Sequence, residues 1–150
     1  MSTYVLVHGA YHGGWCYEQV VPLLEAAGHT AIAVDLPGHG KNRKPIEEVT
    51  LAAYVDHVSA IIEAQSEPVI LVGHSLGGMT ITEVSERLPE KVSWVVYLTA
   101  VMLKNGQDRA ELAVYDNPES MTAKRIISAV GLSATMPSEI IPETFYGQCS

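Results

Sequence analysis

The chain has 150 residues, of which 47% are hydrophobic and 17% charged, a composition typical of a globular domain. Its 17 acidic and 9 basic residues give a net charge of -8 at pH 7, which argues against a nucleic-acid or anionic-membrane surface. The 2 cysteines are too few for a disulfide framework, and no apolar run approaches the ~20 residues of a membrane span. A strand-like run begins by Tyr4 and leaves no room for a secretory signal, so we expect a soluble, cytoplasmic protein.

Four short apolar runs rich in valine and isoleucine predict the strands of a parallel sheet that is covered on both faces. They span residues 3–8, 30–36, 68–74 and 92–100. Helical periodicity lies between them, at residues 17–27, in the stretch after Thr50 and at residues 76–88. Strands that alternate with helices in this way are typical of right-handed βαβ crossovers.

The periodicity also predicts which side chains of the first two helices face the sheet. The first helix should turn five apolar side chains to one side: Val20, Val21, Leu23, Leu24 and Ala27. Pro22 leaves the start of that helix open. Thr50 should cap the second helix, and Asp56, Ser59 and Glu63 should face the solvent.

Residues 103–150 differ in character from the preceding part of the chain. Asparagine, glycine and proline interrupt short amphipathic pieces there, and no strand pattern stands out. Only Met121–Val130 has a helical pattern. We expect this stretch to be an excursion from the sheet rather than a second core.

The segment VILVGHSLGGMT, residues 69–80, contains a G-x-S-x-G motif centred on Ser75. The motif follows a predicted strand directly and opens a helix, as a nucleophile elbow requires. The serine of such an elbow adopts a strained backbone conformation, and side chains at positions 73 and 77 would collide there. We therefore predict that Ser75 is a nucleophile, and the alternative is a small-residue turn without chemistry.

A second glycine-rich segment, VHGAYHGGW at residues 7–15, follows the first predicted strand. A tetrahedral oxyanion needs two N–H groups fixed in advance, and enzymes with this kind of elbow place one of them in this loop. We assign the two donors to the backbone N–H groups of Ala10 and Leu76. We expect His8 and His12 to be structural rather than to act as the base.

The turn DLPGHG at residues 35–40 follows the second predicted strand. Asp35 is expected to order this loop rather than to act as a catalytic acid, and His39 is expected to be structural. The six histidines of the chain show neither HExxH spacing nor pairing with cysteines, so we predict no metal site and no cofactor.

Together, the segments VLVHGAYHGGW, AVDLPGHG and VILVGHSLGG resemble the α/β-hydrolase superfamily. They are most similar to its small-esterase branch of methylesterases, salicylate-binding esterases and hydroxynitrile lyases. The resemblance covers residues 3 to about 100, and FYGQCS at 145–150 is similar to the end of that branch's cap. It implies the α/β-hydrolase fold, a parallel sheet flanked by helices, incomplete at the C-terminal side. Residues 1–102 would be the N-terminal part of the core, and residues 103–150 the beginning of a helical cap region.

The resemblance also implies a triad of serine, aspartate and histidine in that order, with Ser75 as the nucleophile. No histidine follows His74 in this chain, and Asp108 and Asp116 lie in the expected cap, so neither is assigned to the triad. The triad acid and base are therefore missing from their expected positions. We expect the chain to be a fragment, cut from a longer protein or paired with a complementary C-terminal segment that carries both groups.

The predicted function is hydrolysis of a small-molecule carboxylic ester through an acyl-enzyme on Ser75. Hydroxynitrile lyases typically carry threonine where this chain has Gly9 and glutamate where it has His74, so these two pocket residues favour an esterase. A slow-turnover receptor for a small molecule and a non-catalytic fragment remain open alternatives. Haloalkane dehalogenation is disfavoured because that chemistry uses a carboxylate at the position of Ser75. The oligomeric state is left open.

Overall fold

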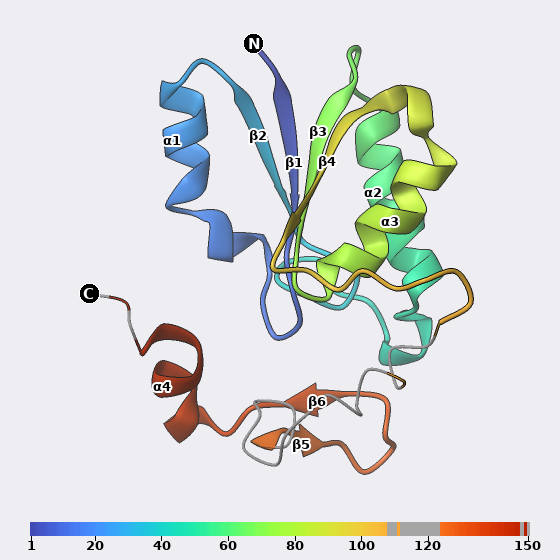
Figure 1. Cartoon of the computed structure of the whole chain (residues 1–150). Helices are drawn as coiled ribbons and strands as arrows, with labels where there is room; N and C mark the ends of the chain where they lie inside the picture. The colour runs from blue at the N-terminus through green and yellow to red at the C-terminus, as the bar shows by residue number, and fades with distance from the viewer. Residues whose placement is uncertain (108–110, 112–123, 148, 150) are drawn as a thin grey trace. The chain divides into compact units, whose positions relative to one another are not determined.

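A four-stranded parallel sheet forms the centre of residues 1–102 in the computed structural model, which describes residues 1–107, 111, 124–147 and 149 (Figure 1). The strand order is β2-β1-β3-β4, and every neighbouring pair is parallel. The strands are β1 (Thr3–Val7), β2 (Thr30–Val34), β3 (Val69–His74) and β4 (Val92–Leu98). Each lies within a run that the sequence predicts to be a strand, so the prediction of a parallel sheet is confirmed.

Helices cover both faces of this sheet (Figure 1). One face packs against α1 (Val20–Ala26), and the other against α2 (Leu51–Glu63) and α3 (Gly77–Arg87). Short 3-10 turns complete the connections, at Gly14–Tyr17, Ile46–Glu48 and Pro89–Lys91. As predicted, Thr50 caps α2, and its hydroxyl oxygen accepts a hydrogen bond of 3.1 Å from the Ala53 N–H.

The core is unequal on the two faces of the sheet. The larger cluster joins β1, β2 and β3 to the apolar faces of α2 and α3, and includes Val5, Val58, Ile62, Leu71 and Ile81. The smaller cluster lies beneath α1 and is centred on Leu6, Tyr17 and Val72. The two clusters differ in size because one face of the sheet is covered by the short helix α1 alone, whereas the other is covered by the two longer helices α2 and α3.

The predicted face of the first helix is partly wrong. Val21 and Leu24 pack against the smaller cluster, but Val20 is 41% exposed and Leu23 is 70% exposed. Residues 17–27 are not one continuous helix, because a 3-10 turn precedes α1 and Pro22 lies in its first turn. Val21 and Leu24, three residues apart, share the side of α1 that packs on the sheet, whereas Ala27 follows the helix as its C-cap and is exposed.

The prediction that Ser59 faces the solvent is wrong, since only 3% of this residue is exposed. Ser59 follows Val55 by four residues and precedes Ile62 by three, so it shares the buried side of α2 with both. Val55 and Ile62 belong to the larger core cluster, which also includes side chains of α3. Asp56 and Glu63 are exposed, as predicted.

The buried Ser59 hydroxyl has no hydrogen-bond partner among the described residues. Because an unpaired buried hydroxyl loses its bonds to water on folding, Ser59→Ala should raise the free energy of unfolding by about 1 kcal/mol. Urea denaturation of the intact protein checks this. Ser85→Ala is the matched control, because the Ser85 hydroxyl donates to the Thr82 carbonyl at 2.8 Å, and its removal should not stabilise the fold. A destabilised Ser59→Ala variant would contradict the prediction.

The chain divides into two compact units, Met1–Met102 and Leu103–Ser150. The described part of the second unit contains an antiparallel pair, β5 (Ile126–Ile127) with β6 (Ala134–Thr135), the 3-10 turn Ser138–Ile140, and α4 (Ile141–Tyr146). None of the described helices is long and apolar enough to cross a membrane.

The helix predicted at Met121–Val130 is wrong where the structure describes it. Ile126 and Ile127 form β5, and residues 121–123 lie outside the described residues, as do Asp108 and Asp116. β-Branched isoleucines favour a strand over a helix. A turn then reverses the chain, with Gly131 at a φ of 71° and the Ser128 N–H donating to the Ser133 carbonyl at 2.9 Å.

Candidate active site

Ser75 lies at the sharp turn between β3 and α3 with a φ of 51°, in the left-handed region that non-glycine residues seldom adopt. The flanking glycines leave the room that this turn requires. A Cβ atom at Gly73 would lie 2.7 Å from Ile81 Cδ1, and one at Gly77 would lie 2.7 Å from the Val7 carbonyl oxygen. Backbone strain and close packing thus coincide at this serine, as the sequence predicts for an elbow.

The segment that follows β4 supports the elbow from the other side. The Val101 N–H donates to the Ser75 carbonyl at 2.8 Å, and the Ser75 N–H donates to the Leu98 carbonyl at 3.4 Å. Thr99, between these two contacts, has a φ of 42°, which is costly for a β-branched residue. The sequence analysis does not predict this bend. The position of Thr99 directly after β4, at the edge of the sheet where β3 also ends, is the feature that could have indicated it.

Strained residues gather at one edge of the sheet. Tyr11, Ser75 and Thr99 are the non-glycine residues with a positive φ among those described, and they follow β1, β3 and β4. The carboxyl ends of parallel strands lie at the same edge, where open α/β sheets bind their ligands. The three segments therefore converge on the edge that carries Ser75.

The loop after β1 lies directly against this serine. A Cβ atom at Gly9 would lie 2.9 Å from Ser75 Cβ and 3.1 Å from His74 Nδ1, so no larger residue fits there without displacement. Leu76 forms the N-terminal boundary of α3, and Ala10 is half-buried in the loop after Gly9. The structure thus brings together all five site residues that the sequence singles out.

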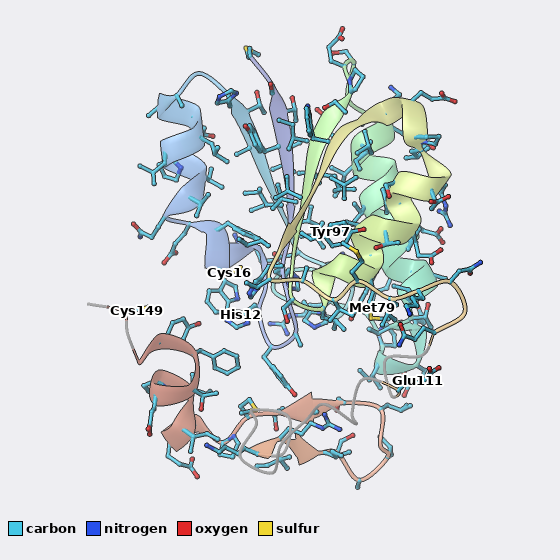
Figure 2. All side chains as sticks on the ribbon, in the orientation of Figure 1. His12, Cys16, Met79, Tyr97, Glu111 and Cys149 are labelled. Carbon is cyan, nitrogen blue, oxygen red and sulfur yellow. The ribbon has the colours of Figure 1, made fainter. Side chains whose placement is uncertain are left out.

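Burial shifts the pKa of two side chains in this region, the His74 imidazole and the Cys16 thiol. Burial lowers the pKa of His74 below its ordinary value, and the nearby His12 lowers it further, so His74 is neutral at pH 7. His12 stacks on Trp15 with the ring centroids 5.2 Å apart. Figure 2 labels His12 and Cys16 in the segment after β1. Burial raises the pKa of the Cys16 thiol to about 11, which makes it a poor nucleophile at neutral pH.

Asp35 orders the loops around the site, as expected from its position after the second strand. Its carboxylate accepts the Gly14 N–H at 2.6 Å and the Lys41 N–H at 3.0 Å, which joins the loop after β1 to the loop after β2. Burial alone would raise the pKa of Asp35, but these two N–H groups outweigh it and hold the pKa below its ordinary value. A side chain at Gly40 would collide with this carboxylate.

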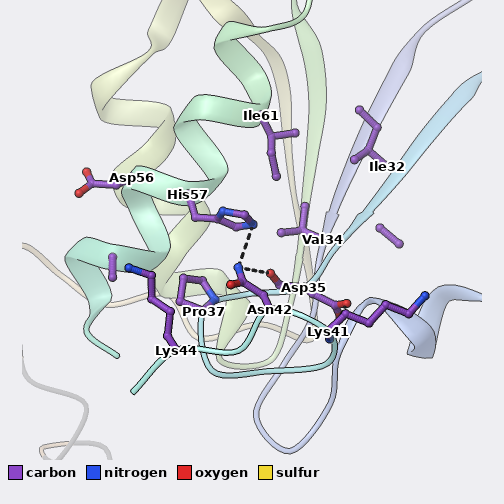
Figure 3. Close-up of a pocket in the computed structure, with 12 residues that line it drawn as sticks. Ile32, Val34, Asp35, Pro37, Lys41, Asn42, Lys44, Asp56, His57 and Ile61 are labelled. Atoms are coloured by element: carbon purple, nitrogen blue, oxygen red, sulfur yellow. Dashed lines mark hydrogen bonds between the residues drawn. The ribbon is translucent and has the colours of Figure 1, made fainter. Parts of the chain in front are cut away.

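A separate hollow of about 710 Å³ lies between β2 and α2 (Figure 3). Its walls include Ile32, Val34 and Ile61. The Asn42 side-chain amide donates to the Asp35 carbonyl at 3.1 Å and lies 3.4 Å from His57 Nε2. Neither Ser75 nor Gly9 lines this hollow, so it does not extend the candidate site.

The part of the chain that the structure describes contains no group of three or more His, Cys, Asp or Glu side chains arranged to hold a metal ion. The rings of His8, His39 and His57 contact backbone, tyrosine or amide groups. The groups around Ser75 are therefore backbone amides, small residues and the neutral imidazole of His74. Such a site is suited to nucleophilic attack at a carbonyl carbon.

Residues 4–148 match the alpha/beta hydrolase family. Salicylic acid-binding protein 2 of Nicotiana tabacum is 38% identical over 147 residues, which make up 96% of this chain and 56% of that protein. The carbendazim hydrolyzing esterase of Nocardioides sp. (strain SG-4G) is 40% identical over 128 residues, which make up 84% of this chain and 53% of that protein.

A crystal structure of a pyrethroid hydrolase aligns with a TM-score of 0.85 and 30% identity, covering 97% of this chain and 61% of that one. The chain thus spans little more than half the length of these relatives. Almost all of its residues match the family, and the parallel sheet, the flanking helices and the strained Ser75 turn agree with that match. The chain belongs to the alpha/beta hydrolase family, within its branch of small esterases.

Proposed function

We propose that the intact protein is a serine esterase in which Ser75 is the nucleophile. The observation that carries this proposal is the φ of 51° at Ser75, held between close-packed glycines at the start of α3. A strained, half-buried serine at a strand–helix turn presents its hydroxyl at the edge of the sheet, and the N-terminal end of α3 stabilises negative charge beside it. The names of the relatives, among them an esterase and a hydrolase, support the same reaction class.

In the proposed mechanism, Ser75 Oγ attacks the ester carbonyl carbon while its proton passes to a histidine base. The carbonyl oxygen becomes an oxyanion, which accepts hydrogen bonds from the backbone N–H groups of Ala10 and Leu76. Collapse of this intermediate expels the alcohol, which takes the proton, and leaves an acyl group on Ser75. Water, activated by the same histidine, then releases the carboxylic acid. No step requires a metal or a cofactor.

We place the base and its acid partner on a complementary segment that carries the C-terminal part of the fold. The rings of His8 and His39 contact backbone carbonyls, and that of His57 contacts the Asn42 amide. No histidine follows His74, and the matched residues make up only 56% and 53% of the two curated relatives. The proposed substrates are small carboxylic esters that reach Ser75 past Gly9 and His74.

A hydroxynitrile lyase on the same fold is the second candidate function. The packing at Gly9 argues against it, because a threonine at this position would place its Cβ 2.9 Å from Ser75 Cβ.

The intact protein should therefore hydrolyse p-nitrophenyl acetate and should release little cyanide from mandelonitrile. Both rates are measured on one preparation at the same pH, with Ser75→Ala as the blank. Cyanide release that is faster than ester hydrolysis would reverse the choice between the two functions. A protein that binds simple esters without turning them over would favour the slow-turnover receptor.

A further inference from the structure

The peptide group between Gly9 and Ala10 is held from its carbonyl side by a buried histidine. The Gly9 carbonyl oxygen lies 2.8 Å from His8 Nδ1. No described peptide bond is cis, so the Gly9 carbonyl and the Ala10 N–H point to opposite sides of one rigid plane. Whatever fixes the direction of this carbonyl therefore also fixes the direction of the Ala10 N–H.

The hydrogen bonds of His8 determine its tautomer. The Leu36 N–H donates to His8 Nε2 at 3.2 Å, so Nε2 carries no proton and Nδ1 must be the donor to the Gly9 carbonyl. His8 is fully buried, and burial lowers its pKa to about 4, with His39 adding to this effect. The ring is therefore neutral at neutral pH, with one fixed donor and one fixed acceptor.

The next carbonyl in the loop is held in the same way. His12 Nδ1 lies 2.8 Å from the Ala10 carbonyl oxygen, and Tyr11 has a φ of 64°. Both peptide planes that flank Ala10 are thus bonded to imidazole rings. Of these two rings, His8 is the one that bonds to the peptide group containing the Ala10 N–H. Gly9, at the start of this peptide group, lies close to Ser75.

We propose that His8 is a positioning residue whose Nδ1–H bond to the Gly9 carbonyl aims the Ala10 N–H at the oxyanion that forms on the ester. The inference rests on the proposed function and goes beyond it, because it assigns a role in transition-state stabilisation to a residue that never touches the substrate. The Leu36 N–H, in the segment after β2, selects the tautomer of the ring that carries its proton on Nδ1, so that this nitrogen can donate to the Gly9 carbonyl. A preorganised donor of this kind accelerates the reaction because it needs no reorientation as charge develops.

Two isosteric variants of the intact protein separate the two hydrogen bonds of His8. In His8→Asn, the amide nitrogen occupies the place of Nδ1 and can still donate to the Gly9 carbonyl, but the Leu36 N–H loses its acceptor. In His8→Gln, the amide oxygen occupies the place of Nε2 and can still accept from Leu36, but the Gly9 carbonyl loses its donor. Each variant loses one bond of a buried ring, so their losses of thermal stability should be similar.

Turnover should separate the two variants where stability does not. Loss of one oxyanion donor lowers kcat by about 100- to 1000-fold, so a misaimed donor in His8→Gln should lower it by about 10- to 100-fold with little change in KM. His8→Asn should retain most of the wild-type kcat. Equal kcat values in the two variants, or losses that follow the melting temperatures, would overturn the proposal and leave His8 as a packing residue.

A second measurement keeps this test independent of catalysis. In amide spectra of the intact protein, the Ala10 resonance should keep its wild-type position in His8→Asn and should shift or broaden in His8→Gln. An unchanged Ala10 resonance in His8→Gln would overturn the inference even if the enzyme is active. If the wild-type protein shows no ester hydrolysis, or if its hydrolysis does not depend on Ser75, the proposed function is refuted. The Ala10 resonances would still decide whether His8 positions this peptide group.

Discussion

Replacing Ser75 by alanine in the intact protein should lower kcat for small esters by about four to six powers of ten. The loss is this large because no other group can form the acyl-enzyme at the same place, while the oxyanion donors and the substrate contacts remain. The fold should survive, since the Cβ of alanine occupies the position that Ser75 Cβ already fills beside Gly9. Steady-state kinetics over a series of p-nitrophenyl esters measures the effect.

Ser85→Ala provides the control for this loss. Ser85 lies in α3, the helix that follows Ser75. Its hydroxyl donates to the Thr82 carbonyl at 2.8 Å, a contact within the helix. Its replacement should leave kcat within about twofold of the wild-type value, as expected for a side chain remote from the chemistry. If Ser75→Ala retained a tenth of the wild-type kcat while Ser85→Ala matched it, another group would have to be the nucleophile.

Residues 1–150 expressed alone should self-associate and should lack esterase turnover. The reason is the side of β4 that faces away from α3, where Trp94 is 70% exposed, Val96 is 40% exposed and Leu98 is 48% exposed. The strand is also the last in the sheet, and its outer edge has no partner strand among the described residues. An apolar face beside an open strand edge is a template for pairing with other chains.

Charged substitutions test the cause of this association. Trp94→Glu should shift residues 1–150 towards the monomer in size-exclusion chromatography. Leu23→Glu should not, because Leu23 is equally exposed, at 70%, but lies on α1 away from the open strand edge. Addition of a segment that carries the remaining strands and the triad should abolish the association. A monomeric, active preparation of residues 1–150 would contradict this account and would require a base among the six histidines of the chain.

The strands and the elbow are predictable from the sequence because their signals are local. Four runs of β-branched residues mark the strands, and the glycines around Ser75 mark a turn whose geometry admits no larger side chain. The segment after β1 is predictable for a similar reason, since Gly9 must leave room for the serine. These features depend on what each residue can do within its own few neighbours.

The features that the sequence does not predict depend on partners that are distant in the chain. Ser59 is buried on the side of α2 that carries the core residues Val55 and Ile62, and Leu23 is exposed because only part of the apolar side of α1 packs on the sheet. The strained Thr99 lies between Leu98 and Val101, whose backbone groups bond to Ser75, a residue more than 20 positions earlier in the chain. Likewise, the role inferred for His8 depends on the Leu36 N–H, which lies 28 residues away.

The most direct test of the central claim is to identify the residue of the intact protein that a fluorophosphonate labels. Such a probe reacts with a serine hydroxyl that is activated within a working site. Peptide mapping by mass spectrometry should find one adduct, on Ser75, and the Ser75→Ala variant should take up no label. Labelling of a different serine, or a wild-type protein that hydrolyses esters without any adduct on Ser75, would contradict the assignment of Ser75 as the nucleophile.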